Sequence, residues 1–181
     1  TGQSSGGSGG GEVQPAVAFR SQLSATQSIA SDAWVKVNFD SVSGADLFDT
    51  SSSFDTTLNR FKPTTEGYYQ VNSVIRITGD TISMTLAQIQ LRKNGADYEG
   101  GNLLSPPTSG DQYKLSTIVY LDGKDDYVEM FGYAQGDNLN FQRFEGEKAN
   151  NCYFSASLIT GQSSGGTGGG YTPEPMVWED K

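Results

Sequence analysis

Apolar and polar residues alternate in short runs through the middle of the chain. Trp34-Val-Lys-Val-Asn-Phe39 alternates throughout, and Tyr69 to Ile77 alternates in part. Ala87, Ile89 and Leu91 share one parity, so on a strand they would point to one face while the polar residues between them point to the other. This pattern predicts several short β-strands and no helix.

Turn-forming residues separate these hydrophobic runs. Asn94-Gly95 and Asp122-Gly123 are pairs that favour the positive-φ turns of β-hairpins. Ser105-Pro106-Pro107 and Gln135-Gly136-Asp137-Asn138 interrupt the pattern in a similar way. Short strands at regular spacing with turns between them predict an all-β sandwich or barrel.

A Gly/Ser-rich segment occurs twice and flanks the strand-rich region. Thr1–Gly11 recurs as Thr160–Gly170, with Thr167 in place of Ser8. Because one linker plus one domain separates the copies, the repeat predicts that a longer parent chain carries such units in tandem; an engineered linker is the alternative. The composition predicts a flexible linker at residues 1–14, one domain at 15–160, a second linker at 161–170 and a tail at 171–181.

The C-terminal tail and the first residue suggest how this chain relates to a longer protein. The tail contains two prolines, which bar a helix, and an apolar Met176-Val177-Trp178 trio among acidic residues. It is predicted to be either a docking segment or a disordered end. Because the chain begins with Thr1, we expect a fragment or a processed product.

Charge and cysteine content exclude several classes of partner. The formal net charge of the 181 residues is −9, which opposes binding to nucleic acid and to anionic lipid. No run of apolar residues is long enough to span a membrane. Cys152 is the only cysteine, so no intrachain disulfide can form, and we expect a buried, inert thiol.

The composition also argues against an enzyme. The chain has no histidine, which removes the commonest general base, the common catalytic triads and most zinc sites. Pairs of carboxylates remain as candidates for acid–base chemistry, but most Asp and Glu side chains on loops are only solvated. We therefore predict a non-enzymatic domain without a cofactor.

A block in the middle of the chain reads Phe54-Asp-Thr-Thr-Leu-Asn-Arg-Phe61-Lys-Pro-Thr-Thr-Glu-Gly67-Tyr-Tyr69, with Asp49 five positions before it. This spacing resembles the signature of the C1q globular-head family within the C1q/tumour-necrosis-factor superfamily, which has Asn or Asp at the position of Asp49. The Asn94-Gly95 hairpin and the closing strand around Phe154 also match in order. The resemblance implies an all-β jelly-roll sandwich of about ten antiparallel strands, from about residue 15 to 160.

The motif residues are expected to have structural roles. Phe61 and Tyr69 would flank a turn in which Gly67 supplies a backbone conformation that a side chain would penalise. The signature therefore predicts a core and a turn, with no chemistry of its own.

The resemblance also implies a homotrimer with ligands at apical loops or intersubunit grooves. Independent support comes from strands that are apolar on both faces, because a face that is not in the core needs another cover. The candidate interface residues are Ile118, Tyr120, Tyr127, Phe131 and Tyr133. The alternative is a locally thick core under a long loop.

Two further sites are candidates. Asp122, Asp125 and Asp126 form the densest acidic cluster, and calcium prefers such oxygen ligands, although the spacing is not that of an EF-hand. Aromatic and polar residues near loops could stack on sugars and hydrogen-bond to them, or could be ordinary surface residues. They are Tyr98, Tyr113, Asn138, Phe141 and Arg143.

Tethers on either side of a domain, one cysteine, no N-glycosylation sequon and no collagen-like repeat fit a phage or bacterial surface protein better than an animal secreted protein. The first hypothesis is a phage virion protein, in a tail fibre, head fibre or capsid decoration, that displays trimeric heads for attachment to host-surface glycan or protein. The alternatives are a structural clamp that binds only other virion proteins, and a secreted bacterial adhesin. All place the chain on a virion surface or otherwise outside the cell, with the ligand-binding residues unassigned.

Overall fold

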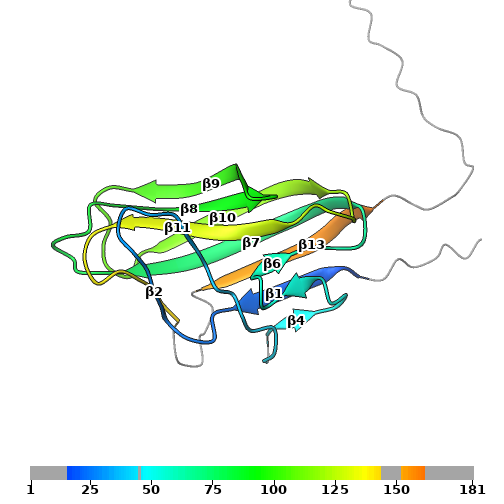
Figure 1. Cartoon of the computed structure of the whole chain (residues 1–181), viewed down its shortest axis with the longest axis horizontal. Coiled ribbons are helices and arrows are strands. Elements are labelled where there is room, and N and C mark those ends of the chain that lie inside the picture. The colour runs from blue at the N-terminus through cyan, green and yellow to red at the C-terminus, as the bar shows by residue number, and fades with distance from the viewer. Residues whose placement is uncertain (1–15, 45, 144–151, 162–181) are drawn as a thin grey trace, which may run out of the picture.

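The computed structural model describes residues 16–44, 46–143 and 152–161, which form two antiparallel sheets packed face to face (Figure 1). The predicted linker at 1–14, most of the second linker and the tail lie outside these residues. The last described strand runs to Gly161, one residue past the predicted domain boundary. Within the described part, no helix is long and apolar enough to cross a membrane.

The first sheet has seven strands in the order β2-β12-β7-β13-β1-β4, with β10 also paired to β7. Its strands are β1 (Ala18–Gln22), β2 (Gln27–Ser28), β4 (Phe48–Asp49), β7 (Gly67–Thr78), β10 (Gln112–Leu121), β12 (Asn140–Phe141) and β13 (Tyr153–Gly161). The chain's first and last described strands are neighbours, because β1 pairs with β13.

The second sheet has six strands in the order β5-β6-β11-β8-β9, with β3 also paired to β11. Its strands are β3 (Val35–Lys36), β5 (Phe54–Asp55), β6 (Arg60–Phe61), β8 (Leu86–Lys93), β9 (Ala96–Leu104) and β11 (Val128–Gln135). Strands β8 and β9 form the predicted Asn94-Gly95 hairpin. Both turn residues have the positive φ that this tight turn requires, 54° and 79°.

The core lies between the two sheets and is rich in aromatic rings. The ring centroid of Phe19 lies 4.5 Å from that of Phe54, 4.6 Å from that of Phe61 and 5.0 Å from that of Phe154. Three of these rings belong to the recognised signature and closing strand. Ala87, Ile89 and Leu91 are also fully buried, as their parity predicts.

The described chain contains thirteen strands rather than about ten. The excess comes from two-residue pairings at the margins of the sheets. The expected strand Trp34–Phe39 is one such case, because only Val35 and Lys36 pair with β11. Val37 and Phe39 still point into the core, but the amide of Phe39 bonds to the carbonyl of Val37, so the chain turns away from the sheet.

Gly67 has the backbone conformation expected of it, because its positive φ of 158° is one that residues with side chains rarely adopt. It is the first residue of β7, paired with Leu121 on one side and Gly161 on the other. The bend between Phe61 and Tyr69 lies in the preceding residues, 62–66. Gly67 therefore stands where this bend ends and the strand begins.

The start of β1 and the end of β13, where the two Gly/Ser-rich segments attach, lie at one end of the sandwich. In Figure 1 the blue start of β1 and the orange end of β13 lie at the same end. The connections from β7 to β8, β9 to β10 and β11 to β12 lie at the opposite end, called here the far end. The Gly/Ser-rich segments therefore attach at the end of the sandwich opposite the far end.

Candidate functional site

Large apolar side chains gather on the outer face of the first sheet, near the end where the chain enters and leaves. Tyr68 and Ile118 are each 52% exposed, Ile159 is 50% exposed and Tyr120 is 37% exposed. Tyr68 and Tyr120 are paired across β7 and β10, with ring centroids 5.3 Å apart. We call these four residues the tyrosine face. They are four of the nine exposed large hydrophobic side chains among the described residues.

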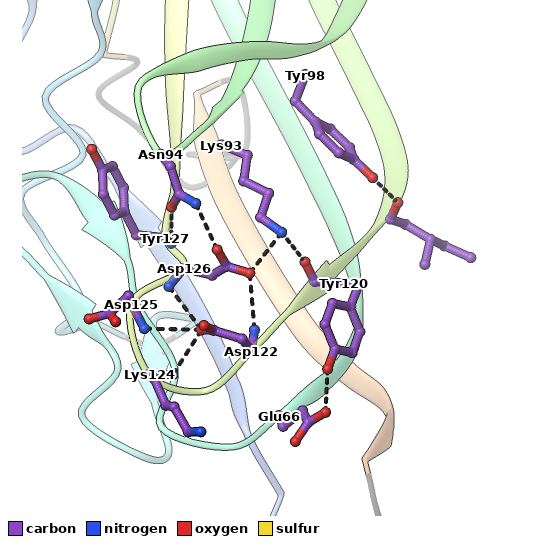
Figure 2. Close-up of polar contacts among 11 residues, drawn as sticks. Glu66, Lys93, Asn94, Tyr98, Tyr120, Asp122, Lys124, Asp125, Asp126 and Tyr127 are labelled. Atoms are coloured by element: carbon purple, nitrogen blue, oxygen red, sulfur yellow. Dashed lines mark hydrogen bonds and ion pairs between the residues drawn. The ribbon is translucent and has the colours of Figure 1, made fainter.

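Hydrogen bonds hold the tyrosine face in place. The hydroxyl of Tyr120 donates to a carboxylate oxygen of Glu66, and this bond is the main reason that the pKa of Tyr120 is raised to about 12. The hydroxyl of Tyr98 donates to the backbone carbonyl of Ile118 at 3.1 Å. Figure 2 shows both contacts. The ring of Tyr120 is therefore fixed before any partner covers it.

A polar row borders the tyrosine face on the same sheet. The amide nitrogen of Gln70 lies 3.1 Å from the hydroxyl of Ser116 and 3.1 Å from the carbonyl of Thr117. The hydroxyl of Ser116 donates to Asn72 Oδ1 at 2.9 Å. The outer face of the sheet thus changes from apolar to amide-rich within one step along the strands.

The predicted interface residues lie on two different sheets. Ile118 and Tyr120 belong to the tyrosine face. Tyr127, just before β11, and Phe131 and Tyr133 within it lie with the second sheet, and all three are half-buried. Because the two outer faces point in opposite directions, the five residues do not form one continuous surface.

The residues of the second group are covered partly by their own chain. The guanidinium of Arg92 lies 4.1 Å from the ring centroid of Phe131, and that of Arg60 lies 4.8 Å from the ring of Tyr127. Trp34 packs beside Tyr133 with centroids 5.5 Å apart. Side chains of the same chain therefore cover part of each of these three rings.

The acidic cluster between β10 and β11 is a loop that caps itself (Figure 2). Asp122 Oδ1 accepts hydrogen bonds from the backbone amides of Lys124, Asp125 and Asp126, at 2.9 to 3.0 Å. These bonds, led by the one from Asp126, lower the pKa of Asp122.

Asp126 joins this loop to the β8–β9 hairpin. Its carboxylate accepts a hydrogen bond from the side chain of Asn94 at 2.7 Å and forms an ion pair with Lys93 at 2.7 Å. Burial opposes ionisation of Asp126, but the bonds from Lys93, Asn94 and the amide of Asp122 outweigh it and lower its pKa. Lys93 also donates to the carbonyl of Tyr120 at 2.8 Å, so one ammonium group links both sheets.

These contacts engage two of the three calcium candidates with groups of the same chain. The carboxylates of Asp122 and Asp126 face backbone amides, Asn94 and the ammonium of Lys93, while Asp125 points outward and its carboxylate lies 3.8 Å from Lys62. Across the described ranges there is no group of three or more His, Cys, Asp or Glu side chains that could hold a metal ion.

The sugar-contact candidates separate into buried and exposed residues. Tyr113 and Phe141 are fully buried, so the prediction that they stack on sugars is wrong: β10 and β12 turn these side chains into the core. Tyr98 and Asn138 are exposed, on β9 and in the β11–β12 loop. Arg143 bonds to the backbone carbonyl of Ser24. The structure does not bring the five together.

The remaining motif residues have structural positions. Asp49 accepts hydrogen bonds from the backbone amides of Ser51, Ser53 and Phe54 and so closes the turn between β4 and β5. The hydroxyl of the buried Tyr69 donates to the carbonyl of Thr65 at 2.6 Å. Cys152 is buried, which raises the pKa of its thiol to about 12.

Sequence reasoning missed two members of the tyrosine face, Tyr68 and Ile159. Both have a signal in the sequence. Tyr68 has the parity of Gln70 and not that of the buried Tyr69, and Ile159 has the parity of Ser157 and not that of Phe154. Large apolar residues on the polar side of neighbouring strands are the sequence signal for an exposed apolar patch.

No protein-family model matches the chain, and no curated protein matches it in sequence. Solved structures do match in fold. The globular domain of zebrafish complement 1qA protein is 14% identical, with a TM-score of 0.56 over 81% of this chain and 99% of that one. Eiger TNF from S. frugiperda is 14% identical, with a TM-score of 0.54 over 86% and 99%. Murine APRIL is 9% identical, with a TM-score of 0.56 over 80% and 99%.

At this level of identity the comparisons establish the fold. The described residues form a C1q/TNF-like jelly roll, which confirms the fold that the signature around Phe54 to Tyr69 predicts.

Proposed function

We propose that this C1q/TNF-like jelly-roll domain is a non-enzymatic module that assembles as a homotrimer and displays its far end and outer surface to a binding partner. The tyrosine face carries the proposal. It places four large apolar side chains on one rigid sheet, and soluble monomers rarely leave such a patch uncovered.

A second copy of the chain is the cover that these observations favour. The face is apolar and lies on long, mutually paired strands, so its backbone is held in place before association. The polar row of Gln70, Asn72 and Ser116 beside it would restrict how copies align, because buried amides must find partners. The resemblance to a superfamily whose members are typically trimers selects three copies.

Two observations support the non-enzymatic part of the proposal. The chain contains no histidine. The clustered carboxylates that remain, those of Asp122 and Asp126, are held by backbone amides and Lys93, in positions that stabilise a loop. Groups committed in this way are poorly placed for acid–base chemistry.

The finer proposal is a displayed head on a phage virion, which acts outside the cell and mediates attachment to host-surface glycan or protein. Its support is the repeated Gly/Ser-rich segment on both sides of the domain, together with the attachment of both segments at one end of the sandwich. A tether at one end leaves the other end accessible. Binding of the purified chain to host cells would support this role, whereas binding only to its own particle would favour the structural clamp.

The trimer is tested by absolute mass from light scattering. The proposal expects three times 19.4 kDa for the chain, and a smaller mass for a variant carrying both Ile118→Lys and Tyr120→Lys, because charges in an apolar interface oppose association. The control is Ile82→Lys, at a fully exposed residue in the β7–β8 loop, which should leave the mass unchanged. A monomeric parent chain would refute the trimer.

A further inference from the structure

The outer face of the second sheet carries aromatic rings in register with amide side chains. Across the β11–β8 ladder, Phe131 is paired with Gln90, and Tyr133 is paired with Gln88. Trp34, just before β3, extends the aromatic row, with its ring 5.5 Å from that of Tyr133. All five side chains are partly exposed. We call them the aromatic–amide face.

Hydrogen bonds and stacking hold this face rigid. The guanidinium of Arg92 lies 4.1 Å from the ring of Phe131 and 5.8 Å from that of Trp34. Its Nε donates to Gln90 Oε1 at 3.1 Å. At the other end, the hydroxyl of Tyr133 accepts a hydrogen bond from Gln135 Nε2 at 3.0 Å. A ligand that binds here therefore orders few side chains, which reduces the entropic cost of binding.

The cations on this face are paired with carboxylates of the same chain. Lys36 forms an ion pair with the buried Glu129, and Arg92 forms one with Asp97 at 3.2 Å. Beside Tyr133 lies the carboxylate of Asp32, which accepts hydrogen bonds from the hydroxyl of Tyr133 at 3.3 Å and from Gln135 at 2.8 Å. The face therefore has no excess of positive charge, and the chain as a whole carries −9. Anionic polymers are repelled at long range and find no unpaired Lys or Arg in this cluster to hold them.

The chemistry that remains fits a saccharide. Arg92 covers the ring of Phe131, so the rings of Trp34 and Tyr133 are the ones that offer apolar surfaces for the C–H faces of pyranose rings. The carboxamides of Gln88 and Gln90 beside them can donate to hydroxyl groups and accept from them. Alternation of the two along one sheet face matches a ligand that is apolar on its faces and polar at its edges. An apolar protein segment would leave the amides without partners.

We propose that the aromatic–amide face binds a neutral saccharide. This proposal rests on the proposed display function and names the class of ligand for it. The tyrosine face lies on the opposite sheet, so the surface proposed for self-assembly and the surface proposed for the saccharide share no residue. The two activities can therefore be tested with separate substitutions.

The test starts from the full chain with Trp178→Phe, which leaves Trp34 as the only tryptophan. Binding to an array of neutral and anionic bacterial polysaccharides selects a neutral glycan, and a soluble oligosaccharide of that glycan is then titrated while Trp34 fluorescence is followed. We expect a saturable fluorescence change. Tyr133→Ala should weaken affinity by about tenfold or more, as removal of a central aromatic contact does.

Two further variants distinguish a site from a folding effect. Gln88→Leu keeps the bulk of the side chain and removes its hydrogen bonds, so it should also weaken binding. Phe48→Ala removes an exposed ring on β4 of the other sheet and should leave the affinity unchanged. If Tyr133→Ala does not fold, the affinity of Gln88→Leu alone tests the saccharide site.

Binding to no neutral glycan, to anionic glycans only, or to a host protein in place of glycan would overturn the inference, as would full affinity in Gln88→Leu. Light scattering on the same samples separates this result from the fate of the proposed trimer. A trimer that binds no neutral glycan refutes only the saccharide site, whereas a monomer that binds one refutes only the trimer.

Discussion

Two neighbouring aspartates offer a direct test of how the β10–β11 loop is held. The side chain of Asp126 is 15% exposed and accepts hydrogen bonds from Asn94, Lys93 and the backbone amide of Asp122, at 2.7, 2.7 and 3.1 Å. The side chain of Asp125 is 96% exposed, and its nearest cation is Lys62 at 3.8 Å. Replacing each by alanine removes the same charge from the same loop.

The expected losses differ because the contacts differ. A hydrogen bond to a charged group contributes about 1.5–3 kcal/mol, and Asp126→Ala removes three such bonds while leaving Lys93 partly buried without its carboxylate. Allowing for solvent at the edge of the sandwich, Asp126→Ala should lower the free energy of unfolding by about 2–4 kcal/mol. Asp125→Ala should change it by less than about 0.5 kcal/mol.

Urea denaturation of both variants at one protein concentration, with and without a calcium chelator, measures the difference. We expect a clearly lower midpoint for Asp126→Ala only, and no effect of the chelator on the parent chain. Equal losses in the two variants would refute the internal ion pair as the main support of the loop. A midpoint that falls on chelation would show that calcium stabilises the loop.

Two further predictions concern a buried hydroxyl and acid. The hydroxyl of Tyr113 is buried without a hydrogen-bond partner, and burial raises its pKa, so Tyr113→Phe should stabilise the fold by about 1 kcal/mol in urea denaturation; a loss would show that the hydroxyl has a partner. The pKa values of Asp122 and Asp126 are lowered in the folded state, so their contribution is present above the unfolded value of about 3.9 and is lost as the pH falls through their lower folded values. The thermal unfolding midpoint should therefore decrease when the pH is lowered below about 4, and the decrease should be smaller in Asp126→Ala than in the parent chain. Equal decreases in the two proteins would contradict this account.

Local pattern was enough to predict the sandwich and much of its core. Alternation assigns each side chain to one face of its own strand, and it placed Ala87, Ile89 and Leu91 in the core. The Asn94-Gly95 hairpin followed from backbone preference alone. The spacing of the signature residues from Phe54 to Tyr69 then identified the fold.

Alternation did not reveal which sheet a strand joins. Ile118 and Phe131 both lie on the side of their strands away from the core, but β10 belongs to one sheet and β11 to the other, so the predicted interface separated into two surfaces. Loop position was a similarly weak guide. Tyr113 and Phe141 were predicted to lie near loops, yet they lie on β10 and β12 and both point into the core.

The sequence by itself determined the fold class, the hairpin turns and the absence of histidine chemistry, because these depend on residue type and on neighbours a few positions apart. Only the tertiary structure decided that Lys93 meets Asp126, that Tyr68 joins Tyr120 and that Trp34 lies beside Tyr133. The residues of each pair are 33 or more positions apart. Such contacts depend on strand order and register, which are set by the packing of the whole core and not by any one segment.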